Sequence, residues 1–137
     1  MTVTNQILAL DVGSRRIGVA QADSVSRIAY PLMTIDVDGE ELKAISKLVR
    51  ELSPMVLVVG YPRNQSGDPT AQTESVTSFA AKLRPCDVPI VFQDESLTSV
   101  MAEERLQAQS RPYTKADIDA MAATIILNDY LEANHGH

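Results

Sequence analysis

The stretch that decides the fold is Ile7-Leu8-Ala9-Leu10-Asp11-Val12-Gly13-Ser14-Arg15-Arg16-Ile17-Gly18-Val19-Ala20. Its first four residues form a continuous apolar run, which is typical of a strand buried on both faces. A second strand is expected from Ile17 to Ala22, and the link between the two is short and polar and contains Gly13. We therefore predict an antiparallel hairpin with Asp11 at the end of its first strand.

The rest of the chain alternates between helical and strand-like patterns. A third strand is expected between residues 28 and 35, where Pro31 favours the edge of a sheet. The remaining elements are expected in the order helix, strand, helix, strand, helix, helix, over residues 38–52, 55–59, 70–83, 88–92, 98–109 and 115–131. This order predicts an α/β fold: a mixed five-stranded sheet, with an antiparallel hairpin and parallel crossovers, and helices on both faces.

Length and composition favour a single globular domain over residues 1–137, with residues 134–137 expected as a disordered tail. The chain is 45% hydrophobic and 22% charged, which is typical of globular proteins. No apolar run reaches membrane-spanning length, and no signal peptide is visible. The single cysteine, Cys86, fits a reducing compartment, so we expect a cytoplasmic protein with no membrane partner.

The net charge of −6 lowers the expectation of nucleic-acid binding, since a basic surface supplies most of that affinity. A local basic edge is nevertheless compatible with the total, because several cations fall in predicted loops. Arg15, Arg63, Asn64 and Lys115 are the candidate substrate-binding residues. Each also has an ordinary interpretation: a solvated surface charge for the three cations, and a turn residue for Asn64.

Asp119 is a carboxylate where the helical pattern requires an apolar side chain. At about 100° per residue, it lies one turn before Ala122 and points into the buried face of the last helix. Asp117 is expected on the polar side, alongside Thr124 and Asn128. A buried carboxylate is tolerated when a metal ion or a partner charge meets it.

Two further carboxylates are expected to meet Asp119. Asp11 and Glu95 follow the first and last strands, both apolar enough to be central, and sites in such sheets form at the carboxyl ends of strands. Three clustered carboxylates need a counter-cation, and oxygen ligands select Mg²⁺ or Mn²⁺. Such ions activate water for phosphodiester cleavage. Asp11, Glu95 and Asp119 are therefore the candidate metal ligands and catalytic residues.

Each acid also has a simpler interpretation. Asp11 could shape the turn that contains Gly13. Glu95 could be a charge at the entry of the next helix, and the neighbouring Asp94 is equally eligible for the site. Asp119 could accept a hydrogen bond from a buried Ser or Arg.

Four stretches resemble the YqgF family, also known as RuvX, whose members are ribonuclease H-like proteins. They are residues 11–20, 58–67, 94–99 and 118–127, in that order along nearly the whole chain. The resemblance implies a compact ribonuclease H-like domain and a metal-dependent nuclease that trims the 5′ end of precursor 16S rRNA. It places the catalytic acids at Asp11, Glu95 and Asp119.

Two positions depart from the family pattern. Ser96 stands where the family usually has Arg, which removes a basic side chain next to Glu95, and Tyr61 stands where Leu is usual. Tyr61 could stack on a base or serve as an ordinary packing residue.

Several functions stay open on the sequence. A nuclease for precursor rRNA comes first, and a nuclease for branched DNA, such as a Holliday junction, is its close variant. A catalytically silent RNA-binding module for ribosome assembly is a third possibility. An actin-like phosphotransferase would need two such domains, and the chain has the length of one. No pattern indicates an oligomeric state.

Overall fold

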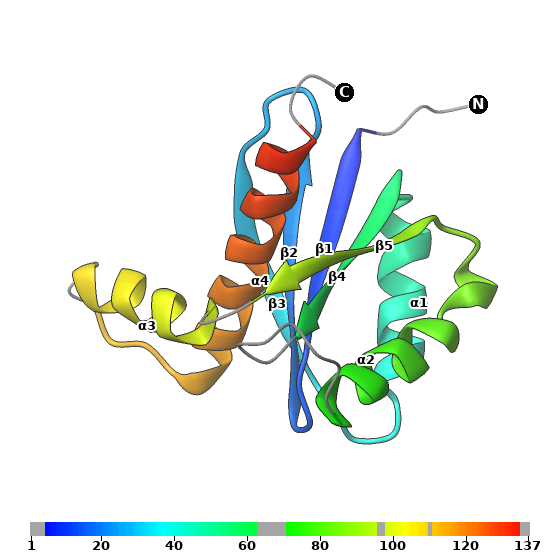
Figure 1. The fold of residues 1–137 in the computed structure, drawn as a ribbon, viewed down its shortest axis with the longest axis horizontal. Coiled ribbons are helices and arrows are strands. Elements are labelled where there is room, and N and C mark those ends of the chain that lie inside the picture. Colours follow the sequence, from blue (N-terminus) through cyan, green and yellow to red (C-terminus); the bar gives the residue numbers. More distant parts are fainter. Residues whose placement is uncertain (1–4, 63–70, 96–97, 110, 135–137) are drawn as a thin grey trace.

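A mixed five-stranded sheet with helices on both faces forms the computed structural model, which describes residues 5–62, 71–95, 98–109 and 111–134 (Figure 1). The elements are β1 (Gln6–Val12), β2 (Arg16–Asp23), β3 (Ala29–Asp36), α1 (Glu41–Leu52), β4 (Val56–Pro62), α2 (Ala71–Ala81), the short 3₁₀ helix η1 (Arg84–Cys86), β5 (Ile90–Glu95), α3 (Thr98–Ala108) and α4 (Lys115–Ala133). This confirms the predicted order of strands and helices, to which η1 is an addition.

The sheet has the strand order β3-β2-β1-β4-β5. β1, β2 and β3 pair antiparallel, whereas β4 lies parallel to both β1 and β5, as predicted. The expectation that the last strand is central was wrong, because β5 forms an edge. Its apolar run is short, and Phe92 on it is 45% exposed, so it does not have the double-sided cover that β1 has.

Two apolar layers sandwich the sheet because β1, β2 and β4 carry apolar side chains on both faces. One face packs against α1 and α2, and the other packs against α4. α3 lies on the outer side of α4, through Ala102 and Leu106 (Figure 1). None of the described helices combines the length and apolar character that a membrane span requires.

Both strands that lead to the predicted site are longer than their apolar runs. β4 continues through Gly60 to Pro62 and β5 continues to Glu95, since their backbones pair up to Pro62 and Glu95. The expected ends at residues 59 and 92 were therefore too early. The apolar run of a strand shows which of its residues are buried. The backbone hydrogen bonds between the parallel strands continue past the last apolar residue, so the run alone does not show where the strand ends.

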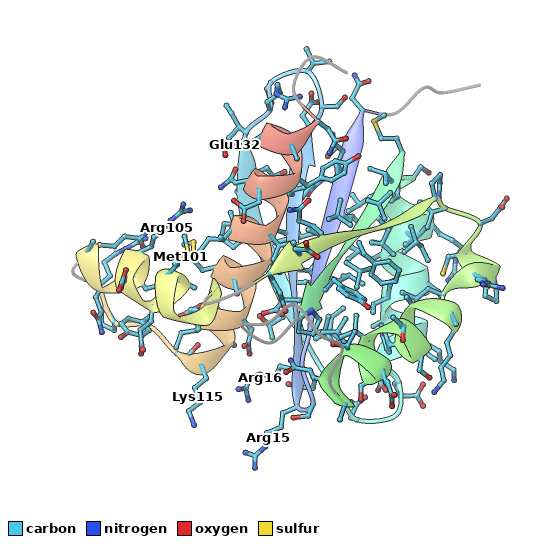
Figure 2. All side chains as sticks on the ribbon, in the orientation of Figure 1. Arg15, Arg16, Met101, Arg105, Lys115 and Glu132 are labelled. Atoms are coloured by element: carbon cyan, nitrogen blue, oxygen red, sulfur yellow. The ribbon has the colours of Figure 1, made fainter. Side chains whose placement is uncertain are left out.

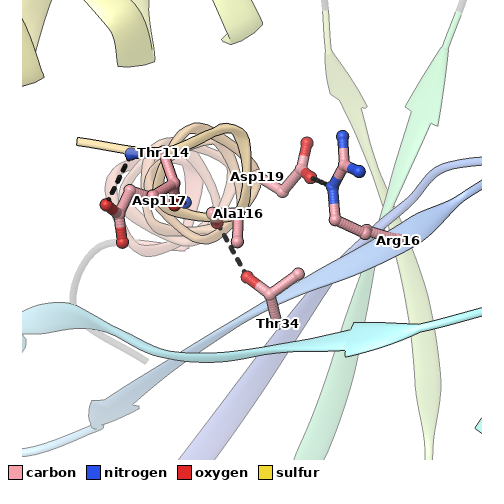
Figure 3. Close-up of polar contacts among 6 residues, drawn as sticks. All are labelled: Arg16, Thr34, Thr114, Ala116, Asp117 and Asp119. Atoms are coloured by element: carbon pink, nitrogen blue, oxygen red, sulfur yellow. Dashed lines mark hydrogen bonds and ion pairs between the residues drawn. The ribbon is translucent and has the colours of Figure 1, made fainter.

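The last helix begins where the sequence predicts, at Lys115. Thr114 caps it: its backbone N–H donates to the Asp117 carboxylate at 2.8 Å, and the Asp117 N–H donates to the Thr114 hydroxyl at 3.2 Å (Figure 3). Asp117 is exposed, as expected. At the other end, Asn134 hydrogen-bonds to the Tyr130 carbonyl, while residues 135–137 of the expected tail lie outside the described residues.

Thr124 corrects the predicted polar side of α4. It is buried, and its hydroxyl donates to the Ala120 carbonyl at 2.9 Å. The expectation was wrong because α4 packs on the sheet and on α3 at once, so most of its circumference is covered. The polar group is tolerated because its hydrogen bond is made within the helix.

Direct backbone contact joins α4 to the sheet at Gly18. A Cβ atom added to this glycine would lie 1.9 Å from the Asp119 carbonyl oxygen and 3.0 Å from the Ala120 nitrogen. Gly18 is also the antiparallel partner of Asp11. The absence of a side chain at one position of β2 therefore sets how closely Asp119 approaches Asp11.

Gly18→Ala should lower the free energy of unfolding by more than about 3 kcal/mol, the upper end of the usual range for overpacking. The new methyl group would have to push the helix backbone away. Gly39→Ala is the control, since no atom lies within 4 Å of its added Cβ and only its φ of 98° is strained. Urea unfolding of both variants measures the difference, and equal losses would contradict the close contact at Gly18.

Candidate active site

The candidate site lies at the carboxyl ends of β1, β4 and β5, on the face that α4 covers. Ala9, Val58 and Val91 of these strands belong to the apolar layer between the sheet and α4. Because side chains alternate along a strand, the α4 face also receives Asp11 and Gly60, two residues further, and Glu95, four residues further. The same alternation turns Asp94 to the opposite face, and Asp94 is exposed. This distinguishes Glu95 from its neighbour, which the sequence left equally eligible.

Gly60 makes room for the Glu95 carboxylate. A Cβ added to Gly60 would lie 2.5 Å from the Glu95 Oε2 atom and 2.7 Å from the Cδ1 atom of Ile126 on α4. The Glu95 carboxylate therefore lies over the backbone of β4 and beside the helix. Its Oε2 atom is buried and has no hydrogen-bond partner among the described residues. Such an atom is costly unless something else neutralises it.

Burial and mutual repulsion raise the pKa of two of the three acids. Burial, and then the negative charge of Asp119, raise the pKa of Asp11 from 3.8 to about 6. Burial, and then the charge of Asp11, raise the pKa of Glu95 from 4.5 to about 8. The structure thus brings Asp119, Asp11 and Glu95 into one electrostatic cluster. Their catalytic roles stay a prediction.

Asp119 also has a partner charge that the sequence did not single out. The Nε atom of Arg16 donates to its Oδ2 atom at 2.6 Å, and the two side chains are 29% and 25% exposed (Figure 3). Arg16 is the first residue of β2 and shares the α4 face with Gly18, two residues further. The alternative in which Asp119 accepts a bond from an Arg is therefore confirmed. The hairpin register and the period of two were the signals that could have found Arg16.

The acids do not form a preassembled metal site. Within the described part of the chain, no group of three or more His, Cys, Asp or Glu side chains is close enough together to hold one ion. The donor set nevertheless fits a hard cation: it consists of oxygens, one of them is buried with no partner among the described residues, and the carboxyls of Asp11 and Glu95 have raised pKa values.

Two of the predicted substrate-binding residues lie at the same end of the molecule as the acids. Arg15 is exposed in the β1–β2 hairpin, next to Arg16, and Lys115 is exposed at the start of α4, one helical turn before Asp119; Figure 2 labels all three cations in the lower part of the view. The Arg15 carbonyl accepts from the Val37 N–H at 2.9 Å, which ties the hairpin to the end of β3. Arg63 and Asn64 lie outside the described residues, as does Ser96.

Tyr61 has a packing contact within the chain. Its ring meets the Phe92 ring edge to face, with 5.5 Å between the centroids. This agrees with the interpretation of Tyr61 as a packing residue.

Two solved structures with a similar fold are complexes with Holliday junction DNA. The T. thermophilus RuvC structure in complex with a Holliday junction substrate matches with a TM-score of 0.63 and 13% identity, over 94% of this chain and 96% of that one. The Fowlpox virus resolvase in complex with junction DNA matches with a TM-score of 0.56 and 11% identity, over 94% of this chain and 98% of that one. These likenesses confirm the ribonuclease H-like fold class.

Relatives in sequence identify the family. The family model described as "RuvX: Holliday junction resolvase" matches residues 5–133. A Roseiflexus protein is 43% identical over 93% of this chain and 94% of its own length, and a Chloroflexus aurantiacus protein is 44% identical over 96% and 89%. Both carry the name "Putative pre-16S rRNA nuclease". The chain belongs to the RuvX family, as its motifs indicate.

The raised pKa values predict that metal-free protein loses stability as the pH rises. Protonation of Asp11 and Glu95 favours the folded state, so this stabilisation is complete below about pH 4 and is lost as the pH passes about 6 and then about 8. Melting temperatures in EDTA should therefore fall between about pH 5 and pH 9. Glu95→Gln should flatten the upper part of this fall, whereas the control Asp94→Asn should not. A wild-type profile that rises over this range would contradict the assignment.

Proposed function

We propose that this chain is a divalent-metal-dependent endonuclease that processes the 5′ end of precursor 16S rRNA in the cytoplasm. One observation carries the proposal: Asp11, Glu95 and Asp119 form one electrostatic cluster, in which the Glu95 Oε2 atom is buried with no hydrogen-bond partner among the described residues. Repulsion of this kind costs stability in the metal-free chain, and it is useful in a chain that binds a cation. The names of the relatives support the choice of RNA substrate.

Asp11, Glu95 and Asp119 would hold the cation, which we propose to be Mg²⁺ or Mn²⁺. When bound, such an ion activates a water molecule and stabilises the leaving oxygen of the phosphodiester. Glu95 holds a proton near neutral pH in the metal-free chain, since its pKa is about 8. It must release that proton to serve as a ligand. Ile126, beside Glu95, limits the access of bulk water to this carboxylate.

The chain's cations would position the substrate. Arg15 and Lys115 are exposed at the acid end of the molecule, where they would contact phosphates, together with Arg63 and Asn64. Phosphate contacts fix the position of a nucleic acid without reading its sequence. A local group of cations is sufficient for this, although the chain as a whole carries a net charge of −6.

Cleavage of branched DNA is the second candidate, because the family model is described as a Holliday junction resolvase. The test is incubation with precursor 16S rRNA and with a four-way DNA junction, each in Mn²⁺ and in EDTA. We expect cleavage of the RNA in Mn²⁺ alone. Cleavage of the junction alone would favour the second candidate, and binding of RNA without cleavage would favour a catalytically silent assembly module.

Asp119→Asn should abolish cleavage in that assay, because the charge that would hold the cation is lost. Asp117→Asn is the matched control two residues away: it faces solvent, and its amide oxygen can still accept from the Thr114 N–H. Its cost should stay under about 1 kcal/mol of stability, the usual scale of a cap, with activity retained. If Asp117→Asn is inactive and Asp119→Asn is active, the proposed site is wrong.

Replacing Arg15 and Lys115 together by Ala should weaken RNA binding and flatten its dependence on salt. Each lost contact with single-stranded phosphate should reduce the slope of log K against log salt by about 0.7, hence by about 1.4 in the double variant. The control removes the same charge from the distant α1 helix, by replacing Lys43 and Lys47 with Ala. Filter binding over a salt series measures the slope for both variants. Equal slopes would mean that Arg15 and Lys115 are ordinary solvated surface charges that do not contact the RNA.

A further inference from the structure

The ion pair between Arg16 and Asp119 differs from the other ion pairs between described residues. It joins two elements that are 103 residues apart in the chain, and both side chains are largely buried. The pairs of Lys43 with Glu40 and of Lys47 with Glu51 lie within or next to α1 and are mostly exposed. Exposed pairs of that kind contribute little, whereas a partly buried pair has a strong influence on where its side chains point.

The guanidinium of Arg16 stands where the acid cluster needs a cation. The charge of Asp119 raises the pKa of Asp11, and the charge of Asp11 raises that of Glu95, so ionised carboxylates in this cluster repel one another. The Arg16 Nε atom neutralises the Asp119 end of this cluster through Oδ2. The Glu95 end keeps a buried oxygen without a partner among the described residues.

A carboxylate has two oxygens, but two cations that share it repel each other, so each weakens the binding of the other. A metal ion held by Asp119 together with Asp11 would take up the electron pairs of the oxygen that Arg16 now contacts, or would draw the carboxylate away from it. The fold holds the backbone of Asp119 close to that of Asp11 through the contact at Gly18, so the two carboxylates lie on the same side of the sheet. Arg16 and the metal are therefore competitors for Asp119.

We infer that Arg16 is a placeholder cation, which holds Asp119 in the metal-free chain and yields it when the divalent metal binds. The inference rests on the proposed function. It makes Arg16 a positioning residue that weakens metal binding and stabilises the metal-free fold. Once released, its guanidinium would be available to contact the phosphates of the substrate, as we propose for Arg15 and Lys115.

The test is calorimetric titration of Arg16→Gln with Mn²⁺, compared with the wild-type chain. Removing the competing charge should tighten Mn²⁺ binding by about three- to tenfold, the scale expected for one charge near a partly buried site. Arg16→Lys, which keeps the charge, should bind within about twofold of wild type. Arg15→Gln removes the same charge from the exposed neighbouring position, where solvent screens it, and should also stay within about twofold.

The sign of the change separates this inference from a purely structural role. If Arg16 only orients Asp119 for the metal, Arg16→Gln should bind Mn²⁺ more weakly, and an equal or weaker affinity overturns the inference. Should Arg16→Gln not fold in EDTA, addition of millimolar Mn²⁺ must restore its folded circular-dichroism spectrum, and a chain that stays unfolded also overturns it. If the wild-type chain binds no Mn²⁺, the proposed function falls as well. If the wild-type chain binds Mn²⁺ and Arg16→Gln does not bind it more tightly, this inference is wrong but the proposed function stands.

Discussion

The contact between the backbones of α4 and β2 at Gly18 is the constraint on which the rest of the site depends. The helix can rest on the strand only where a side chain is missing, since even a methyl group would lie 1.9 Å from the Asp119 carbonyl. Gly18 is paired with Asp11, so the same contact sets Asp119 level with the end of β1. Gly60 has the matching role for Glu95, because it leaves space for a carboxylate instead of a helix. Two glycines on different strands thus allow Asp11 and Glu95 to meet Asp119 of α4.

The packing of the apolar layers offsets the free-energy cost of burying these carboxyl groups. Burial is the main cause of the raised pKa values of Asp11 and Glu95, which means that the fold removes water from carboxyl groups that prefer it. The two faces of the sheet are filled by aliphatic side chains of β1, β2 and β4, and residues 121–127 of α4 are all buried. A helix held on two sides, by the sheet and by α3, does not move away when its own Asp119 is repelled. Strained electrostatics at one end of a well-packed core is the pattern expected of a functional site.

Most of the fold follows from features that are local in the sequence. Continuous apolar runs mark β1 and β4, the helical stripe marks α1, and the break before Lys115 marks α4. What could not be predicted depends on pairing between distant segments. β5 extends to Glu95 because β4 pairs with it there, although its apolar run ends at Phe92. Without that extension the alternation of side chains cannot select Glu95 over Asp94.

The same reasoning applies to the site. Asp119 was recognisable because a charge interrupts an apolar stripe, whereas Arg16 belongs to a polar link and gives no such signal. That Arg16 meets Asp119 depends on the register of the hairpin and on the backbone contact between α4 and Gly18, and both are contacts between distant segments. The position of Thr124 was mistaken for a similar reason, since a helical wheel assumes one buried face and α4 has two.

The net charge is a poor guide to the partner of this chain because the charges are not spread evenly. The acid cluster counts fully toward the total of −6 at neutral pH, although Glu95 holds a proton there in the metal-free chain. Arg15, Arg16 and Lys115 gather at the end of the molecule where the cluster lies (Figure 2). Within a Debye length of about 8 Å at physiological salt, a phosphate responds to these nearby charges and hardly at all to the distant surface of α1. The local field at the ends of the strands, and not the sum over the chain, therefore decides whether a polyanion can approach.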